Sequence, residues 1–218
     1  QAAGAKVVVT VDCGTTAYAA LEAAAGAGLD VVVVDHHVAE AALPPALAVV
    51  NPNRLDEDSP HGHLAAVGVA FLLAVAVNRV LRDRGWFGPA RPAPDLMRWL
   101  DLVALGTVCD VVPLVGVNRA LVTQGLKVMA RRGNPGLAAL ADVAGVRERP
   151  DAYHLGYVLG PRVNAGGRVG EAGLGARLLS TGDAVEAQAI AAQLDGFNKD
   201  RQDIEAQVQA EANEQVES

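Results

Sequence analysis

An aspartate and two histidines directly follow an apolar run in the stretch VVVVDHHVAE, residues 31–40. Four consecutive valines are typical of a strand that is buried on both faces of a parallel sheet. Asp35, His36 and His37 are therefore expected just past the carboxyl end of that strand, at the edge where open α/β sheets bind ligands. The alternative is that Asp35 caps a turn and both histidines lie in a surface loop. Three proton- or metal-binding side chains at one strand end favour a functional site.

Two further aspartates are associated with apolar runs. Asp12 follows KVVVTV, residues 6–11, and Asp110 lies inside GTVCDVVPL, residues 106–114. A carboxylate is costly to bury without a partner, and a metal ion is the simplest partner for several of them. Carboxylates with an imidazole suit Mn²⁺ or Mg²⁺ better than a thiolate-type zinc site. We therefore expect Asp12, His36 and Asp110 to share an ion, although a strand-end aspartate can also cap a helix.

The order of elements predicts an α/β fold with a parallel sheet flanked by helices, because strand and helix patterns alternate. Strands are expected at 6–11, 31–34 and 46–51, and helices at 16–28, 64–84, from about 95, and at 117–132, 135–144 and 183–216. The stretch LGPRVNAGGRVG, residues 159–170, is interpreted as too rich in glycine for regular secondary structure.

The composition limits the class of protein. Hydrophobic residues make up 51% of the 218 residues and aromatic residues 4%, so Ala, Val and Leu must fill the core. Cys13 and Cys109 give no disulfide framework, which favours a reducing compartment, and we expect a cytoplasmic protein. We find no apolar run of membrane-spanning length and no signal peptide. Because the chain enters a strand almost at once, we expect further sequence upstream.

The net charge of −7 comes from one segment of the chain. Nine of the 25 acidic residues but only two of the 18 basic residues lie at or after position 183, so this segment carries the whole net charge. The first 182 residues are neutral. The global charge therefore does not argue against a nucleic-acid partner at a site elsewhere.

Four motifs in this order resemble successive motifs of the DHH phosphoesterase superfamily, and most closely those of its RecJ-type branch, single-strand-specific 5′→3′ exonucleases. These motifs are VDCG at 11–14, DHH at 35–37, GTVCDVVPL at 106–114 and GPRVNAGGRVG at 160–170. The resemblance extends to GVAFLLA at 68–74, NRALVTQGL at 118–126 and LDGFNKDRQDIE at 194–205, and so covers nearly the whole chain.

The resemblance implies a role for each motif residue near the sheet. Asp12 would bridge two divalent ions, and His36 and Asp110 would complete the shell of the second ion. His37 would contact the scissile phosphate or stabilise developing charge. Asp35 would orient a histidine, as metal-bound imidazoles require. Mn²⁺ is the implied metal, with Mg²⁺ as the alternative, and two ions would activate water for phosphodiester hydrolysis.

The resemblance also implies that the glycine-rich motif binds phosphate. Arg162, Asn164 and Arg168 would face the phosphates, although the sequence leaves open which of them contacts substrate. The alternative for the two arginines is a surface ion pair. Gly166 and Gly167 would let the backbone approach an anion.

The chain departs from the family in two places. No aspartate-rich first motif precedes Lys6, and no C-terminal substrate-binding domain follows. Residues 1–182 are therefore predicted to be an N-terminally incomplete DHH domain, and residues 183–218 a connector helix that leaves the domain, exposes its acidic residues and leads towards an absent domain. We expect the chain alone to bind at most one Mn²⁺ weakly and to be nearly inactive.

The predicted function is metal-dependent 5′→3′ exonucleolytic hydrolysis of single-stranded DNA in recombination and repair. A repair helicase or a single-strand-binding protein is the candidate protein partner, and no membrane is involved. Two alternatives stay open. One is a phosphodiesterase on short oligonucleotides or cyclic dinucleotides, or a pyrophosphatase; the other is an inactive DHH module that binds DNA or a partner.

Overall fold

The computed structural model describes residues 4–217. The chain divides into two compact units, which we describe separately. The first consists of Gln1–Trp99 with Asp110–Thr123, and the second of Leu100–Cys109 with Gln124–Ser218. The helix α4 (Gly116–Met129) begins in the first unit and ends in the second.

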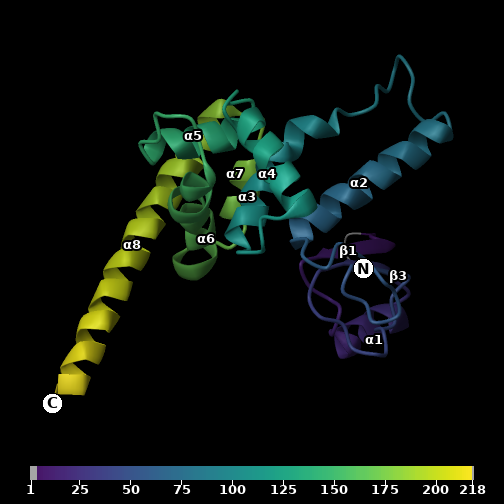
Figure 1. Ribbon diagram of the computed structural model, residues 1–218, viewed down its shortest axis with the longest axis horizontal. Coiled ribbons are helices and arrows are strands. Elements are labelled where there is room, and N and C mark those ends of the chain that lie inside the picture. The colour runs from purple at the N-terminus through teal and green to yellow at the C-terminus, as the bar shows by residue number, and fades with distance from the viewer. Residues whose placement is uncertain (1–3, 218) are drawn as a thin grey trace. The chain divides into compact units, whose positions relative to one another are not determined.

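The first unit is built on a parallel sheet with the strand order β1-β2-β3. Its strands are β1 (Val7–Val11), β2 (Asp30–Val34) and β3 (Ala48–Val50), which confirms the predicted strands (Figure 1). The register pairs Val11 with Val34 and Val34 with Val50. The residues that follow the three strands therefore meet at one edge of the sheet, because parallel strands end on the same side.

Helices flank the sheet and cover both faces of its central strand β2, whereas Val7, Val9 and Val11 of β1 are more than half exposed. Val31 and Val33 pack with Leu21 of α1 (Tyr18–Gly26), whereas Val34 packs on the other face with Leu64 and with Val69 of α2 (Ala66–Asp83). Successive residues of a strand point to opposite faces, so the valine run of β2 supplies both layers of core. This explains why the run is continuously apolar rather than alternating.

The second unit is helical. The 3₁₀ helix η1 (Leu96–Trp99) ends the first stretch of the first unit. The elements of the second unit are α3 (Leu100–Cys109), α5 (Pro135–Val143), the π-helix η2 (His154–Leu159), α6 (Gly160–Val169), α7 (Leu174–Ser180) and α8 (Ala184–Glu217). The predicted helices at 117–132 and 135–144 correspond to α4 and α5. Buried residues of the first half of α8, such as Ile190 and Leu194, pack against α5 and α6.

The prediction of a long C-terminal helix is confirmed, but its acidic residues are not all exposed. Asp195 is buried and binds Arg162 and Lys199. The first half of α8 is thus part of the core of the second unit, and the exposed half begins at Lys199. Within residues 4–217, neither α8 nor another helix is long and apolar enough to cross a membrane.

The prediction that residues 159–170 lack regular structure is wrong, because Gly160–Val169 form α6. Two of its glycines are needed for packing rather than for a turn. A Cβ on Gly160 would lie 2.4 Å from Cys109 Sγ, and one on Gly166 would lie 3.0 Å from Leu194 Cδ2. Close packing against neighbouring elements therefore stabilises a helix that glycine disfavours by propensity. Pro161 in its first turn is compatible with a helix.

Candidate functional site

His36 is held so that one ring nitrogen faces Asp12. Its Nδ1 lies 3.1 Å from the carbonyl oxygen of Leu64, which fits an Nδ1–H donor, and its Nε2 lies 3.3 Å from Asp12 Oδ1. This Nε2 is buried but makes no aligned hydrogen bond. A ring fixed through one nitrogen and presenting the other beside a carboxylate is the usual arrangement of a metal-binding histidine. The donor set therefore fits a divalent ion held between Asp12 and His36.

The third predicted ligand lies near the same ring. Asp110 Oδ2 lies 3.6 Å from His36 Nδ1. The ring nitrogen nearest to Asp110 is therefore a different one from the Nε2 that faces Asp12. Within residues 4–217, Asp12, His36 and His37 form a group of possible metal ligands. Each offers one ligand atom, and these three atoms lie within 4.8 Å of one another. The structure thus brings the predicted ligands together and places His37 closer to the cluster than Asp110.

Asp110 lies where its apolar run leaves a helix, because the part of the run up to Cys109 belongs to α3 and the part after Asp110 does not. It follows that helix directly, and its side chain is 31% exposed. Partial burial raises the pKa of Asp110, Asp12 adds to the rise, and His36 and His37 oppose it. A carboxyl whose charge is disfavoured in this way would gain from a nearby cation.

Asp35 is the buried anchor of the site. It accepts hydrogen bonds from the backbone N–H groups of Thr15 at 3.1 Å and His36 at 2.8 Å, and from His37 Nδ1 at 2.7 Å. Burial alone would raise the pKa of Asp35, but the bonds from His37, Thr15 and His36 hold it well below its usual range. The bond to Asp35 raises the pKa of His37. Asp35 thus fixes the ring of His37, whose side chain is 60% exposed.

Three polar residues that hold this loop, Thr15, Asn51 and Asn53, were not predicted from the sequence. Asn51 donates to Thr15 Oγ1 at 2.9 Å and to the carbonyl oxygen of His37 at 2.8 Å. Asn53 donates to the carbonyl oxygen of His36 at 2.5 Å. Asn51 follows β3 directly, so the same strand-end rule that selected Asp12 and Asp35 would have found it.

The backbone is strained beside two of the candidate ligands. Asp12 has φ 61° and Val111, next to Asp110, has φ 60°. Aspartate tolerates this left-handed conformation, but for a β-branched valine it is unfavourable. Strained backbone tends to occur at functional sites, where the surrounding structure enforces it.

Replacing Val111 with asparagine is expected to stabilise the protein by about 1 kcal/mol, because asparagine adopts the left-handed region at lower cost. The Val111 side chain is 88% exposed, so little packing is lost. Thermal unfolding measures the effect. Val38→Asn, at a side chain that is 77% exposed with an ordinary φ, is the control and should not stabilise. Equal changes from both substitutions would exclude strain at Val111 as the cause.

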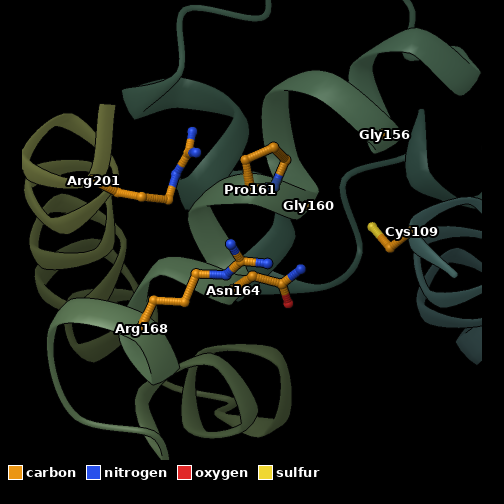
Figure 2. A pocket seen from close by; sticks show the side chains of 7 residues that line it. All are labelled: Cys109, Gly156, Gly160, Pro161, Asn164, Arg168 and Arg201. Carbon is orange, nitrogen blue, oxygen red and sulfur yellow. The ribbon is translucent and has the colours of Figure 1, made fainter. Parts of the chain in front are cut away.

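The second unit contains a separate cationic pocket of about 170 Å³. It is lined by Cys109, Gly156, Gly160, Pro161, Asn164, Arg168 and Arg201. Figure 2 shows Arg168 extending towards Asn164, with Arg201 on the α8 side and Cys109 opposite. Within residues 4–217, no hydrogen bond or ion pair engages the Arg168 guanidinium. Two guanidinium groups and an amide in one pocket suit an anion such as a phosphate.

Arg162 is not among the residues that line this pocket. Its Nε donates to Asp195 Oδ1 at 2.9 Å and its Nη1 to the carbonyl oxygen of Val158 at 2.7 Å. Burial would raise the pKa of Asp195, but Lys199 and Arg162 hold it below its usual value. Arg162 therefore forms an ion pair, which is the alternative that the sequence left open. The pair is largely buried and not at the surface.

The two motif glycines differ in their surroundings. Gly166 is buried, and a Cβ there would lie 3.0 Å from the carbonyl oxygen of Glu171. Gly167 is exposed with no atom near the position of a Cβ. Gly166 thus serves the packing of α6, and of the two glycines only Gly167 leaves open space beside the backbone.

His154 binds two carboxylates in the second unit. Its Nδ1 lies 2.7 Å from Asp151 Oδ1 and its Nε2 lies 3.0 Å from Glu148 Oε1, an arrangement in which both nitrogens donate only in the imidazolium form. Burial lowers the pKa of His154, but the bonds to Glu148 and Asp151 outweigh it and raise the pKa. Backbone hydrogen bonds and then the ring of His154 lower the pKa of both carboxyls.

The stability of the protein is therefore expected to depend on His154 most strongly in mildly acidic solution. A raised pKa in the folded state contributes stability that is fully present below about pH 6.5 and is lost as the pH rises through the folded value. The lowered carboxyl pKa values contribute above about pH 4 and lose their effect on acidification. Unfolding curves should show that His154→Gln lowers the free energy of unfolding most between these two pH limits, and less at pH 9. The same substitution is then made in a chain that also carries Glu148→Gln and Asp151→Asn. If His154→Gln still lowers the free energy of unfolding with the same pH dependence, the two carboxylates are not the cause.

Known proteins resemble this chain in sequence and in structure. Residues 4–107 match the family model "DHH family, N-terminal domain". The "Single-stranded-DNA-specific exonuclease RecJ" of Escherichia coli (strain K12) is 45% identical over 215 residues, which is 97% of this chain and 37% of that protein. The protein of the same name from Thermus thermophilus is 39% identical over 90% of this chain and 27% of its own length.

Two solved structures extend the comparison. The crystal structure of RecJ in complex with Mn²⁺ from Thermus thermophilus matches with a TM-score of 0.80 and 38% identity, over 93% of this chain and 29% of that chain. The complex with Mg²⁺ from the same source matches with a TM-score of 0.70 and 35% identity over 93% of this chain and 27% of that chain. The chain thus spans between 27% and 37% of the length of these relatives. In its parallel sheet, its Asp-His-His edge and these similarities, the chain resembles the DHH family over residues 4–107 and RecJ proteins over nearly its whole length.

Proposed function

We propose that this chain forms part of a metal-dependent 5′→3′ exonuclease that hydrolyses phosphodiester bonds in single-stranded DNA. The observation that carries the proposal is the buried Nε2 of His36, which lacks an aligned hydrogen bond and lies 3.3 Å from Asp12 Oδ1 at the carboxyl edge of the sheet. The RecJ proteins that resemble the chain are single-stranded-DNA-specific exonucleases, and related structures contain Mn²⁺ or Mg²⁺.

Asp12, His36 and Asp110 would hold a divalent ion, with Mn²⁺ as the first candidate and Mg²⁺ as the second. His37 is close enough to add a ligand or to meet a phosphate oxygen. When bound, two such ions in a complete site supply an activated water and stabilise charge on the phosphate oxygens. We propose that Asp35 positions His37 and lies outside the metal shell, because its hydrogen bonds are directed at Thr15, His36 and His37.

Asn164 and Arg168 are proposed to bind a backbone phosphate of the substrate. Both line the cationic pocket, and a guanidinium that binds no carboxylate is available to an anion. Arg162 would instead support α6 through Asp195. Gly167 would allow the strand to pass close to the backbone, and Gly166 would hold α6 against its neighbours.

Hydrolysis of end-labelled single-stranded DNA with Mn²⁺ tests this function. The assay uses the 218-residue chain and a chimera in which it replaces the matching 215 residues of the Escherichia coli relative. The chimera should release mononucleotides from the 5′ end, and the chain alone should be nearly inactive, since Asp12, His36 and Asp110 can form one incomplete ion site. Cleavage restricted to dinucleotides or cyclic dinucleotides would favour a sister phosphodiesterase. DNA binding without hydrolysis by the chimera would favour an inactive module.

The remaining assignments are proposals of the same kind. A repair helicase or a single-strand-binding protein is proposed as protein partner, the cytoplasm as the compartment, and residues 1–182 and 183–218 as phosphoesterase domain and connector. Co-purification of the chimera with purified candidate partners, with and without single-stranded DNA, tests the protein partners. Retention only when DNA is present would contradict a direct contact.

A further inference from the structure

Two exposed tyrosines are stacked on each other in the second unit. The rings of Tyr153 and Tyr157 have centroids 5.3 Å apart and planes inclined by 26°, and the residues are 62% and 75% exposed. Aromatic residues make up only 4% of this chain. Aromatic side chains contribute most to stability when they are buried, so the two tyrosines contribute little to the fold. An exposed stacked pair is instead a surface on which a further flat ring can stack.

The tyrosines belong to the helical segment that forms one wall of the cationic pocket. Tyr157 lies in η2 beside Gly156, and Gly156, Gly160 and Asn164, spaced four residues apart, line the pocket. A π-helix such as η2 is rare and often lies at a functional site. Asn164 follows Tyr157 by seven residues, or about 10 Å along a helix axis. This distance corresponds to about three stacked base steps of a nucleic-acid strand.

The pocket offers groups that can exchange their present contacts for a phosphate. Arg168 binds no other group within residues 4–217. Arg201, from α8, holds Glu205 through Nη1 at 2.7 Å, but its Nε and Nη2 make only long contacts of 3.4 Å with Asn198 Oδ1. Aromatic rings beside cationic groups on one surface are the usual means by which proteins bind single-stranded nucleic acids.

We propose that Tyr153 and Tyr157 form a base-stacking platform for single-stranded DNA, with Arg201 joining Asn164 and Arg168 in binding a backbone phosphate about three nucleotides along the same strand. The inference rests on the proposed function and deepens it, because it gives this surface a reason to prefer single strands. Bases in a duplex stack on one another and do not offer a face to the tyrosines. A strand whose bases are unpaired can stack one base on Tyr157 while a phosphate about three nucleotides away lies in the pocket.

Binding to oligonucleotides with and without bases tests the platform. The 218-residue chain is titrated in EDTA, which prevents hydrolysis, with a labelled oligothymidylate of about 12 nucleotides. The second probe is an abasic oligomer of equal length and charge, and the third is a duplex. Each of Tyr153→Ala and Tyr157→Ala should weaken binding of oligothymidylate about tenfold and leave binding of the abasic oligomer unchanged. Tyr157→Phe keeps the ring and should bind like the unmodified chain. Arg201→Ala should weaken binding of both single-stranded probes.

The outcomes separate this inference from the proposed function. If the unmodified chain binds oligothymidylate and the abasic oligomer equally, or if the alanine variants weaken both alike, the platform is wrong and the proposed function stands. If the unmodified chain and the chimera bind no oligonucleotide, both are wrong. Thermal unfolding of each variant must match the unmodified chain, which the exposure of both tyrosines leads us to expect.

Discussion

Replacing Asp12 with alanine is expected to abolish Mn²⁺-dependent hydrolysis of single-stranded DNA in the chimera, a loss on the order of a thousandfold or more. Asp12 Oδ1 is the carboxylate oxygen beside the free Nε2 of His36. Without it, His36 and Asp110 are too few ligands to hold an ion at moderate metal concentration. Initial rates of nucleotide release, measured over a range of Mn²⁺ concentrations, give the effect. Asp110→Ala is expected to act in the same direction.

Asp30→Ala is the matched control for this experiment. Asp30 is an exposed aspartate of the same sheet, but it begins β2, at the edge opposite the site. Its substitution should leave turnover within about twofold, as expected for a surface change away from the site. In the isolated chain, Mn²⁺ binding followed by electron paramagnetic resonance should be lost in Asp12→Ala and His36→Ala and kept in Asp30→Ala. Turnover of the Asp12→Ala chimera at the unmodified rate would show that the ion, if any, is bound elsewhere.

Replacing Gly125 with alanine is expected to lower the stability of the second unit by about 3 kcal/mol, the upper end for overpacking. A Cβ on Gly125 of α4 would lie 2.1 Å from the carbonyl oxygen of Leu100 and 2.5 Å from Ala104 Cβ, both in α3. Backbone atoms of a helix cannot turn aside as a flexible side chain can, so α3 and α4 must separate. For a chain of this length the melting temperature should fall by about 6–12 °C.

Gly196→Ala is the matched control, because it makes the same change inside another helix. Gly196 lies in α8, and no atom lies within 4 Å of the position of its Cβ. Alanine is favoured over glycine in a helix by about 1 kcal/mol, so this variant should be more stable than the unmodified chain. Calorimetry of both variants decides the point. A similar melting temperature for the two would show that α3 and α4 are not packed through Gly125.

The sequence alone determined the part of the fold that depends on local pattern. The valine run of β2 predicts a strand buried on both faces of a parallel sheet, because such strands are continuously apolar. The apolar runs before Asp12 and Asn51 predict two further strands, of which β1 leaves Val7, Val9 and Val11 more than half exposed. Parallel strands end on one side, so the sequence also determined that Asp12, Asp35 and His36 share an edge. The helical spacing of apolar residues after position 183 was sufficient to predict α8.

Only the tertiary structure decided the contacts between segments distant in the chain. Glycine content predicted an irregular loop at 159–170, but packing of Gly160 on Cys109 and of Gly166 on Leu194 makes it a helix. Local propensity is worth about 1 kcal/mol per glycine, and burial against neighbouring helices outweighs it.

The same holds for the roles of individual charged residues. Arg162 and Arg168 are equivalent in the motif, yet Asp195, 33 residues away, binds one and leaves the other in the pocket. Likewise, the carbonyl oxygen of Leu64 fixes which nitrogen of His36 faces Asp12. A charge or a ring nitrogen is assigned by whichever partner lies within about 3 Å of it, and that partner comes from a segment whose position the local sequence does not encode.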